Sequence, residues 1–272
     1  METLRILITG ITGQMGSYIA DKMLEKGHEI YGMIRRSSSR SLANISHITN
    51  DINLVHGDMI DPSSLDRVVM EVKPHYVFNM AAQTHVGVSF KEPIHTSLVT
   101  AMGVTNLLEA VRKHSPTARF LQSGSSEQFG KVRETPQNEL TPFYPRSPYG
   151  VAKVYAHHMT VNYREAYGMF TVNTISFNFE SPRRANGALS KKVAVGVARI
   201  AYGLQRKIVL GDLEPKRDWN WAPDIADGMI KAIEFRKPTD FVLASGKSYS
   251  VREFVQKAFE VVGIDNFDPY YD

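Results

Sequence analysis

The chain has 272 residues, a hydrophobic fraction of 43% and a formal charge of +4, which suit one large or two modest globular domains. It has no cysteine, and this excludes disulfides, thiolate catalysis and cysteine-ligated metal sites. Because it has no long lysine or arginine run, no leader and no membrane-length apolar segment, we expect a soluble, cytoplasmic protein without a nucleic-acid or membrane partner.

Short apolar runs alternate with amphipathic stretches through the first two thirds of the chain. Strands are predicted over 5–10, 29–35, 52–58, 75–82, 119–125 and 170–178. Helices are predicted over 15–27, 62–73, 94–114 and from Pro148 to about Tyr167. Strands that alternate with helices predict βαβ units, and nearly continuous apolar strands predict burial on both faces. The expected fold class is α/β, with a Rossmann-type, doubly wound parallel sheet.

The pattern changes after residue 178. Residues 179–192 are polar and turn-rich, a helix is predicted over 193–204, and a short apolar segment follows at 207–212. A further helix over 221–235 and a strand over 241–246 return to the earlier pattern. We therefore predict that 1–178 plus about 213–246 form the nucleotide-binding domain. A smaller, interleaved substrate-binding region would comprise about 179–212 plus 247–272.

The first predicted strand ends in TGITGQMG, in which Gly10, Gly13 and Gly16 are spaced as GxxGxxG. Glycines between a strand and a helix allow a tight turn, a close approach of backbone N–H groups to a pyrophosphate, and close packing of the helix. The triplet alone is a weak signal, but its place between strand and helix strengthens it. A glycine turn without a ligand is the alternative.

The second predicted strand leads into IRRSSSRS, which indicates the choice of dinucleotide. An NAD site commonly has an acid here for the ribose 2′-hydroxyl, whereas Arg35 and Arg36 suit a 2′-phosphate. NADP is therefore the predicted cofactor, with a solvated basic loop as the alternative, above all for Arg40. Asp58, after the third strand, could bind the adenine amino group or cap the helix that begins near Pro62.

The motif SPYGVAK places Tyr149 and Lys153 four residues apart on one helical face. An ammonium beside a phenol favours the phenolate, which brings the tyrosine closer to the working range of a base. Ser125, at the end of the fifth predicted strand, would complete a cradle for an alcohol or carbonyl oxygen. The histidines show no metal-ligand spacing, so no metal is expected.

The segments TGITGQMG, NMAAQTHV, SGSSEQFG and YPRSPYGVAK together resemble the extended short-chain dehydrogenase/reductase family. Within it, IRRSSS, ESPRR, LGDLEPKRDW and SVREFV are similar to the GDP-mannose 4,6-dehydratase family, over nearly the whole chain. The resemblance implies conversion of GDP-D-mannose to GDP-4-keto-6-deoxy-D-mannose, with Ser125, Glu127, Tyr149 and Lys153 as catalytic residues. Tyr149 would take the C4 hydroxyl proton. Glu127 would remove the C5 proton and help expel the C6 hydroxyl as water, a need that simple reduction lacks.

The resemblance also implies binding residues and a homo-oligomer, dimer or tetramer, in which Arg184 reaches a neighbouring subunit's cofactor. The cofactor residues are Gly10, Thr12, Gly13, Gln14, Met15, Gly16, Arg35, Arg36, Ser37, Asp58, Met59, Ala81, Ala82, Gln83, Tyr149, Lys153 and Arg184. The substrate residues are Ser89, Ser126, Asn178, Arg217 and Arg252.

Several positions depart from the family pattern. Met15 replaces the usual aspartate of the glycine loop, Phe179 replaces a histidine, and ANGALSKK (185–192) replaces a loop near the nucleotide base. Alternatives are therefore a GDP-heptose 4,6-dehydratase, a GDP-4-keto-6-deoxyhexose reductase, and a non-enzymatic NADP-binding regulatory or assembly subunit. Family members continue beyond SVREFVQKAFEVVG, so we expect the C-terminal part of the substrate region to be truncated.

Overall fold

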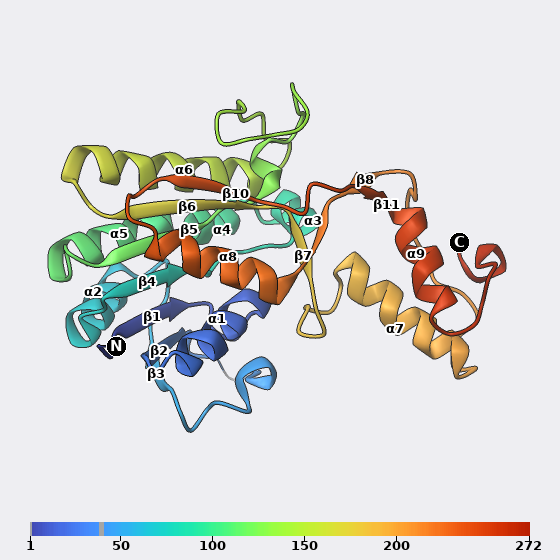
Figure 1. The fold of residues 1–272 in the computed structure, drawn as a ribbon, viewed down its shortest axis with the longest axis horizontal. Helices are drawn as coiled ribbons and strands as arrows, with labels where there is room; N and C mark the ends of the chain where they lie inside the picture. The colour runs from blue at the N-terminus through green and yellow to red at the C-terminus, as the bar shows by residue number, and fades with distance from the viewer. Residues whose placement is uncertain (1, 38–40) are drawn as a thin grey trace. The chain divides into compact units, whose positions relative to one another are not determined.

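The computed structural model describes residues 2–37 and 41–272, which form two compact units (Figure 1). The first unit comprises Met1–Ser176 and Ala222–Leu243, and the second comprises Phe177–Trp221 and Ala244–Asp272. Residues 177–178, 213–221 and 244–246 thus fall in the second unit, although the sequence pattern places them in the nucleotide-binding domain. The reason is local pairing, because β8 and β9 in this stretch bond to other strands of the second unit.

The first unit is built on a seven-stranded parallel sheet in the order β10-β6-β5-β4-β1-β2-β3. The order reverses between β1 and β4, and ligands of doubly wound folds bind at such a switch point, beyond the carboxyl ends of the strands. This confirms the predicted α/β fold class. The strands are β1 (Arg5–Thr9), β2 (Glu29–Ile34), β3 (Asn53–His56), β4 (Tyr76–Asn79), β5 (Arg119–Ser123), β6 (Thr171–Ser176) and β10 (Asp240–Leu243).

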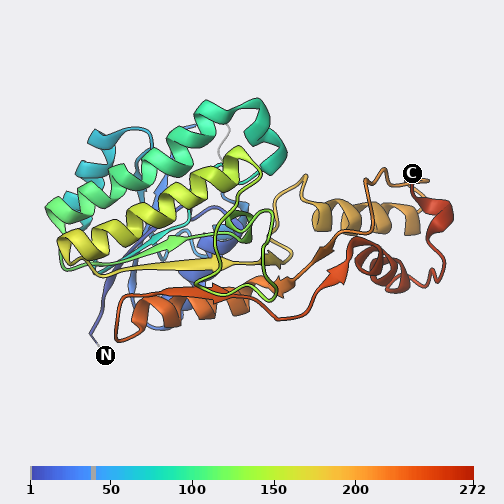
Figure 2. The same ribbon diagram turned by 90° about the horizontal axis from the view of Figure 1, so that it is seen from above.

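Helices cover both faces of this sheet, with α2, α5 and α6 on one face and α1 and α8 on the other (Figures 1 and 2). Apolar side chains of the strands and of α2 and α5, such as Leu7, Phe120 and Leu107, are fully buried between them. The helices are α1 (Gln14–Glu25), α2 (Pro62–Val72), α3 (Val86–Lys91), α4 (Pro93–Ser97), α5 (Gly103–His114), α6 (Pro148–Tyr167) and α8 (Ala222–Glu234), with short helices η1 (Ala43–Ile45) and η3 (Ser126–Gln128).

Helix α6, which carries the predicted tyrosine and lysine, has strong local signals at both ends. The Ser147 side chain caps it by accepting from the Gly150 N–H, and Pro148 occupies the first turn. Gly168 ends it in the left-handed conformation, with φ 64°. The ends of this helix therefore match the sequence prediction.

The predicted helix over 94–114 is divided in the structure. It consists of α4, a π-helical turn η2 (Leu98–Met102) and α5. A π turn inserts an extra residue into a helical ladder without breaking the run of amphipathic residues, so the sequence pattern does not show it.

The second unit contains two small sheets and two main helices. Strand β7 (Asn178–Glu180) pairs with β9 (Trp219–Trp221), and β8 (Lys216–Arg217) pairs with β11 (Tyr249–Ser250). Helices α7 (Leu189–Ala201) and α9 (Val251–Glu260) pack around a core that includes Val197 and Phe259, and η4 (Asp268–Tyr270) follows. The apolar segment 207–212 makes only an isolated bridge, from Ile208 to Tyr271.

No helix among the described residues is both long and apolar enough to span a membrane. In the same part of the chain, no cluster of three or more histidine, aspartate or glutamate side chains could hold a metal ion.

Candidate active site

The glycine loop between β1 and α1 is shaped by contacts that a side chain would block. Gly10 has φ 63°, and a Cβ atom there would lie 3.0 Å from the backbone nitrogen of Ala81. A Cβ atom on Gly16 would lie 2.5 Å from the Gly10 carbonyl oxygen. The Gly13 N–H donates to the same oxygen at 2.9 Å. The loop is thus a tight turn whose backbone is open to close approach by a ligand.

Helix α1 begins with Gly13 as its N-cap and has neither a side-chain cap nor an acidic residue in its first turn. The N-terminus of such a helix attracts an anion through its N–H groups and its dipole. The Asn44 side chain donates to the Thr12 carbonyl oxygen at 3.1 Å and ties the loop to η1. Gln14 and Met15 are buried at the base of the loop. These features fit a dinucleotide pyrophosphate.

Arg35, Arg36 and Ser37 follow β2 and are all exposed, as a 2′-phosphate site requires. The other predicted members of this basic segment, Ser38, Ser39 and Arg40, lie outside the described residues. Exposure leaves the two guanidinium groups able to bind a phosphate from solvent.

Asp58 follows β3 and is half-buried, and its carboxylate accepts from the Ile60 N–H at 3.1 Å. It does not cap α2, which was one of its two predicted roles. The N-cap of α2 is Asp61, whose side chain accepts from Ser63 and Ser64, directly before Pro62. The cap belongs there because Pro62 fixes the first helical position. Met59, the next predicted cofactor residue, is buried.

Ala81, Ala82 and Gln83 follow β4, close to the glycine loop, and are half-buried. The Ala81 N–H donates to the Thr9 hydroxyl at 3.0 Å, which binds the end of β4 to the end of β1. The Gln83 side chain accepts from the His85 N–H at 2.6 Å. The structure therefore brings this predicted group to the switch point of the sheet.

Ser125, Ser126 and Glu127 lie at the carboxyl end of β5, all half-buried. Ser125 caps η3, because its hydroxyl accepts from the Glu127 N–H at 3.2 Å. The Gln128 side chain accepts in return from the Ser125 N–H at 2.8 Å, which completes a capping box. This box fixes the backbone that carries the serine and the glutamate.

Tyr149 and Lys153 lie in the first two turns of α6, and both are nearly buried. The Lys153 Nζ donates to the Ser123 carbonyl oxygen at 2.6 Å and lies 5.8 Å from the centre of the Tyr149 ring. Burial lowers the pKa of Lys153 to about 8. The pKa of Lys153 therefore lies only slightly above neutral pH, and the charged form is favoured there.

Gly150 lies in α6 at the place where this helix packs against the segment that carries Ser125 and Glu127. A Cβ atom at this position would lie 2.7 Å from the Glu127 carbonyl oxygen. Helix α6 can thus pack directly against η3, and the four predicted catalytic residues share one end of the sheet.

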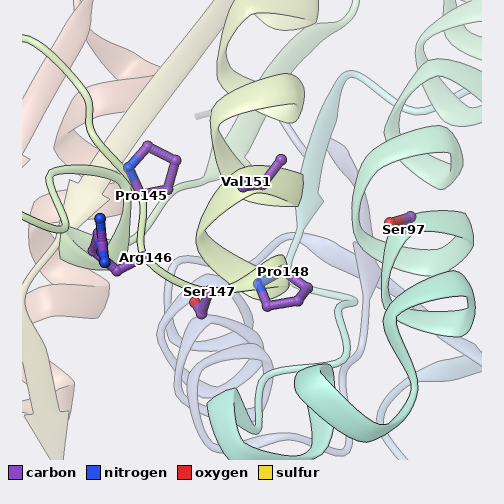
Figure 3. A pocket seen from close by; sticks show the side chains of 6 residues that line it. All are labelled: Ser97, Pro145, Arg146, Ser147, Pro148 and Val151. Atoms are coloured by element: carbon purple, nitrogen blue, oxygen red, sulfur yellow. The ribbon is translucent and has the colours of Figure 1, made fainter.

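A shallow depression of about 430 Å³ adjoins the start of α6 (Figure 3). Val151 and Ser97 lie on its walls, from α6 and α4 respectively, and Arg146 borders it. It contains none of the predicted catalytic side chains. The candidate site therefore lies with the polar groups at the end of β5, outside this hollow.

Ser89, a predicted substrate residue, is fully buried in α3. Its hydroxyl donates to the Val86 carbonyl oxygen at 2.6 Å, within the same helix. In this structure the hydroxyl is thus used as a donor inside the helix.

The remaining predicted residues lie in the second unit. Asn178 is half-buried in β7, and its carbonyl oxygen accepts from the Asn220 side chain at 2.9 Å. Arg217 is exposed in β8. Arg252 is exposed at the start of α9, where it pairs with Glu214 at 3.0 Å.

Arg184, predicted to reach a neighbouring subunit, pairs with Glu180 of its own chain at 3.3 Å. Burial raises the pKa of Glu180, while this arginine and a hydrogen bond from Ser190 oppose the rise.

Two side chains that support the site were not predicted as site residues. Asn79 and Gln122 lie in the buried strands β4 and β5, and their amides hydrogen-bond to each other at 2.8 Å. The available signal was a polar residue inside an apolar strand, in YVFN and RFLQS.

A model of the family described as GDP-mannose 4,6 dehydratase matches residues 7–269. The chain is 45% identical over 269 residues to a GDP-mannose 4,6-dehydratase of Vibrio cholerae, covering 96% of this chain and 72% of that protein. It is 47% identical over 270 residues to the enzyme of that name from Yersinia enterocolitica, covering 96% and 73%. It is 45% identical over 267 residues to that of Homo sapiens, covering 94% and 72%.

Solved structures share the fold. UDP-glucose 4-epimerase from Thermotoga maritima, solved with UDP-glucose, has a TM-score of 0.87 and 26% identity, covering 99% of this chain and 85% of that one. UDP-glucose 4-epimerase from Thermus thermophilus, solved with NAD, has a TM-score of 0.86 and 25% identity, covering 99% and 86%.

Proposed function

The chain belongs to the GDP-mannose 4,6-dehydratase family, and on this premise we propose that it converts GDP-D-mannose to GDP-4-keto-6-deoxy-D-mannose. The observation that carries the proposal is the half-buried Glu127, held beside Ser125 by the capping box and packed against the helix of Tyr149 and Lys153. A reductase or an epimerase could work with the serine, tyrosine and lysine alone. Elimination of water needs a further acid–base group.

We propose NADP as the cofactor. The residues fit it, because the uncapped N-terminus of α1 and the glycine contacts suit a pyrophosphate, and the exposed Arg35 and Arg36 suit a 2′-phosphate. Bound NADP would supply the hydride acceptor for oxidation at C4 and the hydride donor for reduction at C6.

Four side chains of this protein would move or hold the protons. The Tyr149 phenolate takes the proton of the C4 hydroxyl, assisted by the charge of Lys153, and Ser125 donates a hydrogen bond to the same oxygen. The 4-keto group that results makes the C5 proton acidic. Glu127 removes that proton, and the C6 hydroxyl leaves as water with a proton from the protonated Glu127. A solvent-derived proton then returns to C5 of the product.

Substrate contacts are proposed on the resemblance. Ser126, Asn178, Arg217 and Arg252 would contact the sugar or the diphosphate, whereas the fully buried Ser89 would do so only after α3 exposes its hydroxyl. Arginine suits a diphosphate because its planar group binds phosphate oxygens in pairs. The cytoplasmic location stays a prediction.

We also propose a homo-oligomer built on an exposed apolar face of the first unit. Four large side chains at four-residue spacing along α3, α4 and η2 are 43–76% exposed, and two more lie on α6. The Tyr155 hydroxyl donates to the Met102 sulfur at 3.5 Å, so the two rows adjoin. Apolar patches of this kind mark protein–protein interfaces. The side chains are Phe90, Ile94, Leu98, Met102, Val151 and Tyr155. An Ile94→Asp variant should elute as a smaller species in light-scattering chromatography, and an unchanged mass would refute this interface.

The proposed reaction is tested with Glu127→Gln in D₂O, with GDP-mannose as substrate. The wild-type product should have lost one water and should carry one solvent deuteron at C5. The variant should form this product about 10²–10⁴-fold more slowly, the usual contribution of a positioned acid–base group.

Glu165→Gln is the matched control, because Glu165 is an exposed carboxylate on α6. It should retain the wild-type rate. A Glu127→Gln variant that also retains that rate would remove Glu127 from the mechanism. Consumption of NADPH without loss of water, with a GDP-4-keto-6-deoxyhexose as substrate, would instead indicate the reductase.

A further inference from the structure

A row of five polar side chains crosses the sheet of the first unit. The strand registers pair Thr9 with Asn79, Asn79 with Gln122, Gln122 with Asn173, and Asn173 with Asp240. The first four side chains are at most 2% exposed. Strands buried on both faces are normally apolar, and a buried polar group is costly unless it is hydrogen-bonded. The row therefore needs a physical reason.

The first half of the row leads to the candidate active site. The Thr9 hydroxyl donates to the Asn79 side-chain oxygen at 2.6 Å. Asn79 donates to the Gln122 side-chain oxygen at 2.8 Å. Gln122 then donates to the Ser123 carbonyl oxygen at 2.9 Å. Since each amide accepts at its oxygen and donates at its nitrogen, the series has one consistent direction.

The Ser123 carbonyl oxygen is also the acceptor for Lys153, at 2.6 Å. The Gln122 side chain thus shares its acceptor with the lysine ammonium. Neutral, buried amides fix that carbonyl without adding a charge next to the lysine.

The second half of the row holds a different part of the same helix. Asn173 donates to Asp240 at 3.0 Å and to the His157 carbonyl oxygen of α6 at 3.4 Å. Asp240 also pairs with Arg164 of α6. The Asn173 side-chain oxygen accepts no hydrogen bond from any described residue. The two halves are continuous in strand register, but the first half contacts the acceptor of Lys153 and the second half contacts the distal part of α6.

We propose that Gln122 is a positioning residue for the dehydration reaction: it holds the Ser123 carbonyl where Lys153 binds, and so sets the place of the lysine beside Tyr149. Asn173, one strand away and equally buried, holds the distal part of α6 and has no such role. The inference rests on the proposed function for its kinetic test. Its second test, the titration of Lys153, is independent of turnover.

The experiment compares Gln122→Met with Asn173→Leu, which each replace a buried amide by an apolar side chain of similar size. Both should lose comparable stability in urea unfolding. Gln122→Met should lower kcat about 10- to 100-fold with KM within about threefold, since a misplaced catalytic group costs rate rather than binding. Asn173→Leu should keep kcat within about twofold of wild type after correction for folded protein.

The second readout is the pH titration of Lys153 by NMR of ¹³C-labelled lysine, assigned by its loss in Lys153→Arg. Tyr149 is the titratable group that faces Lys153 on its own helix, and Glu127 lies on η3, which packs against that helix. Without Gln122 the Ser123 carbonyl is no longer held toward the ammonium, so the hydrogen bond that favours charged Lys153 weakens and its titration midpoint should fall. Asn173→Leu should leave it unchanged.

If Gln122→Met fails to fold, Gln122→Asn takes its place, because it keeps an amide in the row but is too short to reach both partners. It should shift kcat and the titration in the same direction by a smaller amount. An unchanged kcat and midpoint in the Gln122 variants would overturn the proposal, as would equal effects in Asn173→Leu. If wild type does not dehydrate GDP-mannose, the proposed function fails, and the titration alone decides the role of Gln122.

Discussion

The two ends of the candidate site are built in different ways. The glycine loop is made of backbone, since a Cβ atom on Gly10 or Gly16 would contact other backbone atoms. The catalytic end is made of side chains that hydrogen-bond to backbone groups, in the capping box of Ser125 and at the Ser123 carbonyl that accepts from Lys153. A backbone site is sensitive to any added atom, whereas a side-chain site is sensitive to the identity of one functional group. This difference predicts that variants of the glycine loop lose stability and cofactor affinity, whereas variants of the catalytic end lose mainly kcat.

The largest effect should come from Tyr149→Phe, which removes one oxygen from the side-chain end. We expect kcat to fall about 10²–10⁴-fold, because the general base is lost, with NADP affinity within about twofold of wild type. Steady-state kinetics and calorimetric titration with NADP⁺ measure the two quantities. Tyr167→Phe, an exposed position on the same helix, is the control. A Tyr149→Phe variant within tenfold of the wild-type kcat would contradict the assignment.

Gly16→Ala should damage the backbone end. The added Cβ atom would lie 2.5 Å from the Gly10 carbonyl oxygen, so the loop or the helix must move. We expect a loss of about 1–3 kcal/mol in the free energy of unfolding and at least tenfold weaker NADP binding. Urea unfolding and the same titration measure both. Gly211→Ala, where a Cβ atom has nothing within 4 Å, should be neutral. Equal unfolding free energies and NADP affinities in the two variants would show that the short distance between Gly16 and the Gly10 carbonyl is not required for folding or binding.

Lys153 should give the side-chain end a pH dependence. Its pKa is about 8 in the fold, below the ordinary 10.5. Between these values the unfolded chain binds the extra proton, so the contribution of Lys153 to stability rises with pH and is lowest below about pH 8. The total rise is on the order of 3 kcal/mol. The difference in unfolding free energy between wild type and Lys153→Met should show it, and a flat difference from pH 7 to 10.5 would refute it.

The smallest effect concerns the exposed arginines beside the glycine loop. Arg36→Ala should reduce the preference for NADP over NAD about tenfold, the value of one charge-assisted hydrogen bond at an accessible site. Dissociation constants for both cofactors measure the preference. Arg67→Ala, an exposed arginine on α2, should not change it. An unchanged preference in Arg36→Ala would mean that the 2′-phosphate binds elsewhere.

Much of the fold could be predicted because each local signal agreed with the global pattern. The strands around Gly10 and Ser125 are apolar runs bounded by turn residues, and α6 has a cap, a proline and a terminal glycine. The π turn was missed because it leaves the amphipathic pattern intact. The capping role of Asp61 rather than Asp58 depends on where the chain turns. The small sheets of the second unit have strands of two or three residues, too short for a periodic signal.

The catalytic residues could be predicted from the sequence, but the buried residues that hold them in place could not. Ser125, Glu127, Tyr149 and Lys153 belong to motifs with a recognisable spacing. Gln122 has no motif, and its contact with Asn79 depends on the register between β4 and β5. Such a contact joins residues that are distant in sequence, so a local pattern does not reveal it.

The most direct measurement is mass spectrometry of the purified protein incubated with GDP-mannose and NADP⁺. The sugar nucleotide should lose one water while the amount of NADP⁺ stays constant, because the hydride taken from C4 returns to C6. An unchanged substrate mass, or a stoichiometric accumulation of NADPH, would contradict the proposed dehydration.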